Sequence, residues 1–284
     1  SPASISRTVR PRPRAAQAVA RPKIPPPTTH RSGMRCARVV NSVGLPHDPV
    51  PNAPTSPVIY MEPPKAPPLS WRDGRTPVSE IFQDPYYALT DGAAEARHVF
   101  LAGNDLPGRF REGFHIAELG FGTALNALVA WEAWAKAGLA GSLRFTSFEA
   151  FPMPPADMAR ALAAWPALAE RAAPLLAALE RGETQVGLPG LELEVIIGDA
   201  RATVPAWHGA ADAWFLDGFS PARNPELWEP ALMAAVAAHA APGGTFATYS
   251  AAGAVRRALA GAGFAVERAP GFGDKRHMSR GRLA

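Results

Sequence analysis

Short apolar runs alternate with longer stretches of helical period from about residue 110 to the end of the chain. Five of these runs have the length and composition of strands, and they cover residues 114–120, 143–149, 191–199, 211–218 and 244–250. The Ala- and Leu-rich segments between them have helical period and cover residues 123–137, 156–180 and 226–240. This alternation predicts a doubly wound α/β sheet with right-handed crossovers.

The two ends of this pattern differ from its middle. A short predicted helix at 251–261 leads to two further strands, 264–271 and 277–283, with no long helix between them. Such a pair is expected to lie antiparallel at one edge of the sheet. Residues 71–110 have the pattern of turns and short strands. In open α/β sheets ligands bind beyond the carboxyl ends of the strands, so polar residues at those ends are the candidates for function.

The first 70 residues differ from the rest in composition. They hold 16 of the 31 prolines, and ten Lys and Arg residues against two acids, Asp48 and Glu62, which gives a net charge of +8. Residues 71–284 carry a net charge of −4. Because proline interrupts helices and sheets, we interpret residues 1–70 as a disordered extension and residues 71–284 as the folded domain.

Three interpretations of this extension stay open from the sequence. It has the charge of a basic arm that attracts nucleic-acid phosphates. It is Arg-rich and acid-poor like a transit peptide, although its prolines oppose the amphipathic helix of such peptides. It also fits a non-functional extension, upstream of a start at Met34 or Met61.

Composition excludes several classes of protein. No stretch approaches the roughly 18 consecutive apolar residues of a membrane span, so we expect no membrane partner. A single cysteine, Cys36, excludes a disulfide framework and multi-cysteine metal sites. The seven histidines are scattered without metal-ligand spacing, so no metal is expected. One cysteine also suits a cytoplasmic protein.

A glycine-containing turn follows the first predicted strand and opens a helix. It reads Glu118-Leu-Gly120-Phe-Gly122 and continues to Asn126. The glycines permit a tight turn and close backbone approach, and the helix start offers free N–H groups. A dinucleotide fingerprint needs a third glycine at position 125, where this chain has leucine. The turn therefore favours a cofactor without a pyrophosphate, such as S-adenosylmethionine, or simply packs a strand against a helix.

Acidic residues end the next three strands. Glu149 lies 27 residues after Gly122, where a carboxylate can accept both ribose hydroxyls of an adenosine. Asp199 ends the third strand, where it can accept the adenine amino group, and Asp217 ends the fourth, near the reactive end of the cofactor. Each acid alone also suits a helix cap or turn. Three consecutive strands with such ends favour a nucleoside cofactor.

Several longer motifs resemble one known family. They are YALTDGAAEARHVFLAGNDL (87–106), AELGFGTALNAL (117–128), FEAFPM (148–153), AWFLDGFSPARNPELW (213–228), SAAGAVRRAL (250–259) and GFGDKRHM (271–278). In this order and register they resemble the methyltransferase part of the MnmC family of bacterial enzymes that modify the tRNA wobble uridine. The resemblance runs from about residue 70 to the end. Leu119 and Ala124 stand where that family usually has smaller residues.

The resemblance implies a fold, an activity and partners. The fold is a Rossmann-like S-adenosylmethionine-dependent methyltransferase with a mostly parallel seven-stranded sheet, helices on both faces and an antiparallel edge hairpin, in which residues 71–110 lie on the substrate side and 111–284 form the core. The activity is methyl transfer to the aminomethyl nitrogen of 5-aminomethyl-2-thiouridine in tRNA, which gives 5-methylaminomethyl-2-thiouridine. Many members carry a FAD-dependent oxidase domain as well. This chain ends at Ala284, so we expect no FAD here and a separate oxidase as a possible partner.

Roles for individual residues follow from the motifs. Asp217 is the expected catalytic residue, which orients the substrate amine and offsets the repulsion between two cations. The expected cofactor-binding residues are Glu118, Gly120, Gly122, Asn126, Glu149 and Asp199, and the expected substrate-binding residues are Phe219, Tyr249, Lys275 and Arg276, with Tyr86 and Tyr87 as further aromatics. Residues 256–284 hold seven basic residues against two acids, a patch suited to tRNA phosphates.

Two other classes of function share these features. An aminopropyl transferase or a small-molecule amine methyltransferase has the same sheet and acid-ended strands, because a fold does not fix its substrate. A catalytically idle RNA-binding module would keep the sheet for stability alone. Binding of S-adenosylmethionine separates the idle module from the enzymes, and the choice of acceptor separates the enzymes from one another.

Overall fold

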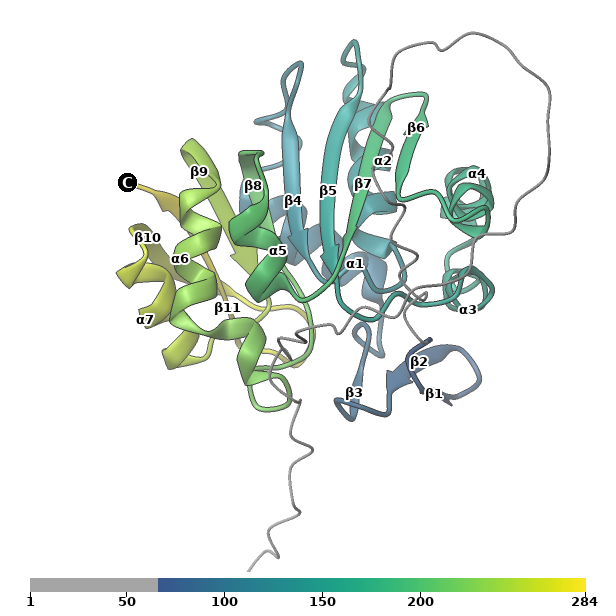
Figure 1. Cartoon of the computed structure of the whole chain (residues 1–284), viewed down its shortest axis with the longest axis horizontal. Coiled ribbons are helices and arrows are strands. Elements are labelled where there is room, and N and C mark those ends of the chain that lie inside the picture. Colours follow the sequence, from purple (N-terminus) through teal and green to yellow (C-terminus); the bar gives the residue numbers. More distant parts are fainter. Residues whose placement is uncertain (1–65) are drawn as a thin grey trace, which may run out of the picture. The chain divides into compact units, whose positions relative to one another are not determined.

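The computed structural model describes residues 66–284, and the predictions for the extension therefore lie almost wholly outside the described residues. Its main sheet has eight strands in the order β10-β11-β9-β8-β4-β5-β7-β6 (Figure 1). In chain order these are β4 (His115–Leu119), β5 (Leu143–Glu149), β6 (Gln185–Leu188), β7 (Leu191–Ile197), β8 (Ala211–Leu216), β9 (Ala240–Thr248), β10 (Phe264–Pro270) and β11 (His277–Leu283).

The sheet confirms the predicted α/β class and corrects its strand number. β9, β8, β4, β5 and β7 are parallel neighbours. β10 and β11 form the expected antiparallel pair at one edge. The seven-stranded prediction is wrong by one strand, because β6 pairs antiparallel with β7 at the other edge. β6 has only four residues, two of them exposed and one of them Gly187, so its apolar pattern is too short to stand out.

Helices cover both faces of the sheet, as expected. One apolar core packs α1 (Gly92–Ala96), α2 (Leu125–Ala137), α3 (Pro155–Leu162) and α4 (Ala169–Glu180) against the sheet. The other core packs α5 (Ala200–Ala206), α6 (Pro230–Ala238) and α7 (Gly253–Gly261), which lie in front of the sheet in Figure 1. The single helix predicted at 156–180 is in fact two, because the chain turns at Trp165 and Pro166.

The segment before β4 contains more structure than the sequence indicated. β1 (Leu69–Arg72), β2 (Thr76–Ser79) and β3 (Asp84–Pro85) form a small antiparallel sheet, as the turns and short strands predicted. After it, α1 continues into a π-helical turn at Arg97–Leu101 and a 3-10 turn at Ala102–Asn104. That helical run was not expected.

Burial on both faces holds the central strands in place. In β8, Trp214 packs into one core and Phe215 into the other, and both side chains are almost fully buried. Burying a side chain of this size stabilises the fold by about 2–3 kcal/mol. Leu119 in β4 lies opposite Phe148 of β5 and Leu216 of β8. The three strands therefore end at the same level, and the residues that follow them meet at one edge.

Candidate active site

The predicted acidic residues lie at the carboxyl edge of the sheet. Glu118 is the residue before the last one of β4, Glu149 ends β5, and Asp217 follows β8 directly. Glu149 lies opposite Ile197, the last residue of β7, and Asp199 comes two residues later. The sequence-based expectation that these acids share one edge agrees with the register of the strands.

The turn from β4 to α2 has a backbone that requires glycine at two positions. Gly120 has φ +88°, and a Cβ there would lie 3.4 Å from the carbonyl oxygen of Asp217. Gly122 has φ +52°, and a Cβ there would lie 3.2 Å from the Tyr86 ring. Ala124, just before α2, is also left-handed, with φ 63°. The turn thus approaches both the β8 loop and the aromatic ring of Tyr86 closely.

A buried hydrogen-bond network joins two of the carboxylates. Asn126 Nδ2 donates to Glu118 Oε1 at 2.9 Å and to Asp217 Oδ2 at 2.7 Å. Ser147 Oγ donates to the other oxygen of Glu118 at 2.7 Å. Glu118 is 1% exposed, and burial, together with the nearby Asp217 and Glu149 carboxylates, raises its pKa well above the usual range. Asn126 therefore fixes Asp217 relative to the glycine turn.

The carboxylate of Glu149 closes the glycine turn from the side of β5. Its Oε2 accepts the N–H of Gly122 at 3.0 Å and its Oε1 accepts the N–H of Phe151 at 2.7 Å. Burial raises the pKa of Glu149, and these backbone N–H groups oppose the rise. Each oxygen keeps acceptor capacity, which suits the binding of two neighbouring hydroxyl groups.

Asp217 has the ionisation behaviour of a group that works near neutral pH. Burial raises its pKa from 3.8 to about 7, and the hydrogen bonds from Gly218 N–H and Asn126 limit the rise. Its Oδ1 accepts the Gly218 N–H at 2.8 Å. The negative charge of Glu95 raises this pKa further, and the positive charge of Lys275 lowers it.

Asp199 lies at the same edge but outside this network. Its carboxylate caps α5 through the N–H of Arg201, at 2.9 Å, and forms an ion pair with the Arg201 guanidinium. That guanidinium, as the largest cause, lowers the pKa of Asp199. The helix-cap interpretation of Asp199 therefore agrees with these contacts, and its role toward an adenine stays a prediction.

Aromatic rings gather beside the glycine turn. Phe219 stacks on Phe82 at 4.6 Å between ring centres and meets the Tyr86 ring edge-on at 5.0 Å. Tyr249 donates its hydroxyl to the carbonyl of Gly218 at 2.7 Å. Tyr87 instead packs on Trp165, away from this cluster. Of the two neighbouring tyrosines, Tyr86 is the one beside the site.

One acidic residue of the site was missed from the sequence. Glu95 lies on α1 and is 8% exposed. Its Oε1 pairs with Lys275 Nζ at 2.7 Å, and its Oε2 accepts the N–H of Ala88 at 3.1 Å. Lys275 also lies over the Tyr249 ring, 4.2 Å from its centre. Arg276 is exposed in the same loop.

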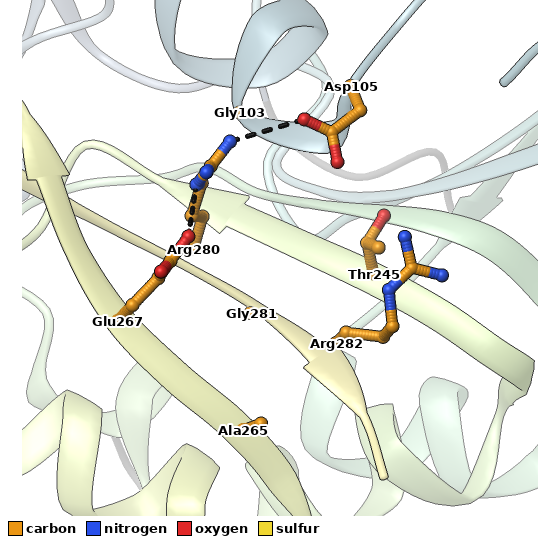
Figure 2. A pocket seen from close by; sticks show the side chains of 8 residues that line it. All are labelled: Gly103, Asp105, Thr245, Ala265, Glu267, Arg280, Gly281 and Arg282. Atoms are coloured by element: carbon orange, nitrogen blue, oxygen red, sulfur yellow. Dashed lines mark hydrogen bonds and ion pairs between the residues drawn. The ribbon is translucent and has the colours of Figure 1, made fainter. Parts of the chain in front are cut away.

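The basic C-terminal residues do not form one continuous patch. β11 runs antiparallel to β9, so Lys275 and Arg276 lie at the carboxyl edge while Arg282 lies toward the other end. A hollow of about 230 Å³ lies where β9, β10 and β11 meet the turn at 103–105. Figure 2 shows its lining residues, among which Arg280 bridges Asp105 and Glu267. Its lining residues include none of those predicted for cofactor or substrate.

Two further features of the described residues bear on the class of site. Within residues 66–284 no group of three His, Cys, Asp or Glu side chains has an arrangement that could hold a metal ion. In the same range no helix combines the length and apolar character needed to cross a membrane.

Comparison with known proteins agrees with this geometry. Residues 167–284 match a family described as S-adenosyl-L-methionine-dependent methyltransferase. The chain is 47% identical over 229 residues to the "tRNA 5-methylaminomethyl-2-thiouridine biosynthesis bifunctional protein MnmC" of Caulobacter sp. (strain K31), over 76% of this chain and 38% of the relative. The protein of the same name from Chromobacterium violaceum is 46% identical, over 76% of this chain and 34% of the relative.

A solved structure supports the same assignment. MnmC2 from Aquifex aeolicus has a TM-score of 0.63 and 26% identity, over 78% of this chain and 72% of that one. The chain spans little more than a third of the length of the curated relatives it matches. The sheet thus has the fold of MnmC2 from Aquifex aeolicus, and residues 167–284 belong to a family of S-adenosyl-L-methionine-dependent methyltransferases.

Proposed function

We propose that this chain methylates the aminomethyl nitrogen of 5-aminomethyl-2-thiouridine at the tRNA wobble position, which gives 5-methylaminomethyl-2-thiouridine. The relatives' names supply the product. The observation that carries the proposal is the Asp217 carboxylate, which has a pKa of about 7. It accepts a hydrogen bond from Asn126, and Asn126 also donates to Glu118 beside the glycine turn. A negative group at this place suits a positively charged amine.

The residues at the carboxyl edge fit the expected cofactor. Gly120 and Gly122 let the turn adopt positive φ close to Asp217 and Tyr86, and Glu149 retains acceptors for ribose hydroxyls. Glu118 and Asp217 place acidic groups beside the turn, and these complement a cation. When bound, S-adenosylmethionine supplies a methyl group on a positively charged sulfonium. We propose Asp199 for the adenine side, since its carboxylate is half exposed although it is paired with Arg201.

Asp217 is proposed to position the nucleophile. An alkylammonium has a pKa near that of lysine, about 10.4, so the amine must lose a proton to expose its lone pair. The amine loses this proton to the bulk solvent before it attacks, because transfer to Asp217, whose pKa of about 7 lies below that of the amine, is unfavourable. The carboxylate then accepts a hydrogen bond from the neutral amine and directs its lone pair. Its charge also offsets the repulsion between the cations in the site.

The aromatic cluster and the basic loop are proposed to hold the tRNA. Phe219 and Tyr249 lie beside Asp217 and suit stacking against a flipped base. Arg276, which is exposed in the loop before β11, provides positive charge at the same edge, while the charge of Lys275 is paired with Glu95. A separate FAD-dependent oxidase as a partner and a cytoplasmic location stay predictions.

Labelled methyl transfer tests the proposal. The full chain is incubated with labelled S-adenosylmethionine and tRNA that carries 5-aminomethyl-2-thiouridine, and the nucleosides are identified by mass spectrometry. We expect methyl incorporation at the wobble uridine, and little with free polyamines or small amines. Label in polyamines alone would favour the aminopropyl or small-amine class, and no binding of S-adenosylmethionine by calorimetry would favour the idle module.

A further inference from the structure

A lysine ammonium lies at the acidic edge of the site, between the Tyr249 ring and Glu95, a carboxylate that the mechanism above leaves unused. Lys275 Nζ is 2.7 Å from Glu95 Oε1 and 4.2 Å from the centre of the Tyr249 ring. The Tyr249 hydroxyl donates to the Gly218 carbonyl at 2.7 Å, and the Gly218 N–H donates to Asp217 Oδ1 at 2.8 Å, so the ring under Lys275 is bonded to the loop that carries Asp217. A carboxylate and an aromatic face are together well suited to an alkylammonium ion. In the free protein, that ion is the protein's own side chain.

The carboxylate in this contact is fixed, whereas the ammonium is able to leave. The Glu95 side chain is 10% exposed, and its second oxygen is held by the Ala88 N–H. The Lys275 side chain is 44% exposed. The loop that carries it is closed by backbone hydrogen bonds, from Lys275 N–H to Phe272 and from Gly271 N–H to Arg276. The lysine side chain can therefore swing into solvent while the loop stays in place.

We propose that Glu95, Tyr249 and Asp217 form the recognition site for the substrate's primary ammonium group, and that Lys275 occupies this site until the substrate displaces it. The inference rests on the proposed function, because it identifies the aminomethyl group of the substrate as the ligand. That group and the lysine side chain both end in a primary ammonium on a methylene carbon. An incoming ammonium thus reproduces the contacts that Lys275 makes.

The exchange explains how a buried carboxylate serves as a recognition group. A buried charge without a partner is costly, and Glu95 would be left so if the site stood empty. Replacement of one ammonium by another keeps Glu95 paired while the substrate binds. A uridine without the amine has no group that can replace Lys275. The site therefore discriminates against unmodified uridine, with Glu95 as a specificity residue.

Binding of methylammonium to Lys275→Met tests the inference without methyl transfer. Methionine keeps an apolar stem and removes the ammonium, so Glu95 is free to bind an external cation. In NMR titrations we expect methylammonium to bind Lys275→Met at least about tenfold more tightly than the wild type. In the double variant Lys275→Met, Glu95→Gln this gain should disappear. Arg276→Met removes the same charge from the same loop and should bind methylammonium with the affinity of the wild type.

Each outcome decides the question. Calorimetry with S-adenosylmethionine confirms that every variant is folded. If Lys275→Met binds methylammonium no more tightly than the wild type, or keeps the gain without Glu95, the displaced-lysine inference is wrong. A wild-type protein that fails to methylate tRNA overturns the proposed function instead, and the binding measurements do not depend on that result.

Kinetics on tRNA provide an independent comparison. If Lys275 competes with the substrate amine, Lys275→Met lowers KM for tRNA that carries the aminomethyl group. Arg276→Met raises KM, because it only removes attraction for phosphate. If both variants raise KM to the same extent, Lys275 acts as a phosphate contact and the inference is overturned.

Discussion

The ionisation of Asp217 controls the predicted activity. Burial raises its pKa to about 7, and only the ionised carboxylate offsets the cations in the site. Loss of the proton from the substrate amine adds about tenfold per pH unit up to about pH 10. We therefore expect log kcat/KM to rise with a slope near two below about pH 7 and near one above it, and this step in slope reports Asp217. Initial rates of methyl transfer between about pH 5 and about pH 9 measure this profile.

The matched variant is Asp217→Asn, which keeps the shape and removes the titration. It should lower kcat by about 10²–10³, comparable to the loss of one preorganised electrostatic group, and remove the step near pH 7. Binding of S-adenosylmethionine should persist, since Glu149 and the glycine turn are unchanged. Wild-type rates in Asp217→Asn would show that this carboxylate has no part in the reaction.

At the scale of single residues, the sequence predicted the functional side chains that lie at the ends of strands. Glu149 and Asp217 follow recognisable strands, so the carboxyl-edge rule places both. Glu95 could not be found in this way, because it lies on a five-residue helix and its partner Lys275 is 180 residues away. Only the folded chain brings these two charges together.

At the scale of an element, the two ends of α2 provide a test of the glycine turn. Gly122 precedes this helix and Gly138 ends it, and both have positive φ. A Cβ at Gly122 would press on the Tyr86 ring, whereas nothing lies within 4 Å of one at Gly138. Gly122→Ala and Gly138→Ala should each cost about 1 kcal/mol of unfolding free energy from backbone strain.

Only Gly122→Ala should also weaken cofactor binding, because Gly122 is bonded to Glu149 and touches Tyr86. Urea denaturation measures the unfolding free energies, and calorimetry with S-adenosylmethionine measures the affinities. Equal affinities in both variants would mean that the turn does not contact the cofactor.

Elements were predictable where burial gave them a long apolar pattern. β5 and β11 match the predicted ranges, since each has seven residues. The predicted 156–180 helix failed because helical period continues across Pro166 although the backbone turns there. α5 was missed because it has seven residues and only two of them are buried. Short elements depend on tertiary packing, which local pattern does not record.

At the scale of the whole molecule, the position of charge matters more than its sum. Residues 71–284 have a net charge of −4, which by itself opposes RNA binding. Arg276 precedes β11 at the carboxyl edge, and Arg282 lies near its far end, about 20 Å away at the rise of an extended strand. The proposed tRNA contact therefore involves the first arginine and not the second.

Neutralising each arginine in turn tests this division. Arg276→Gln should weaken tRNA binding and reduce the slope of log K against log salt by somewhat less than about 0.9, the loss of one phosphate contact. Arg282→Gln removes the same charge and only a bond to the Gly243 carbonyl, so both affinity and slope should match the wild type. Filter binding across a range of salt concentrations gives both quantities. Equal losses of affinity in the two variants would show that tRNA binding depends on total charge, and tRNA would then not dock specifically at the carboxyl edge.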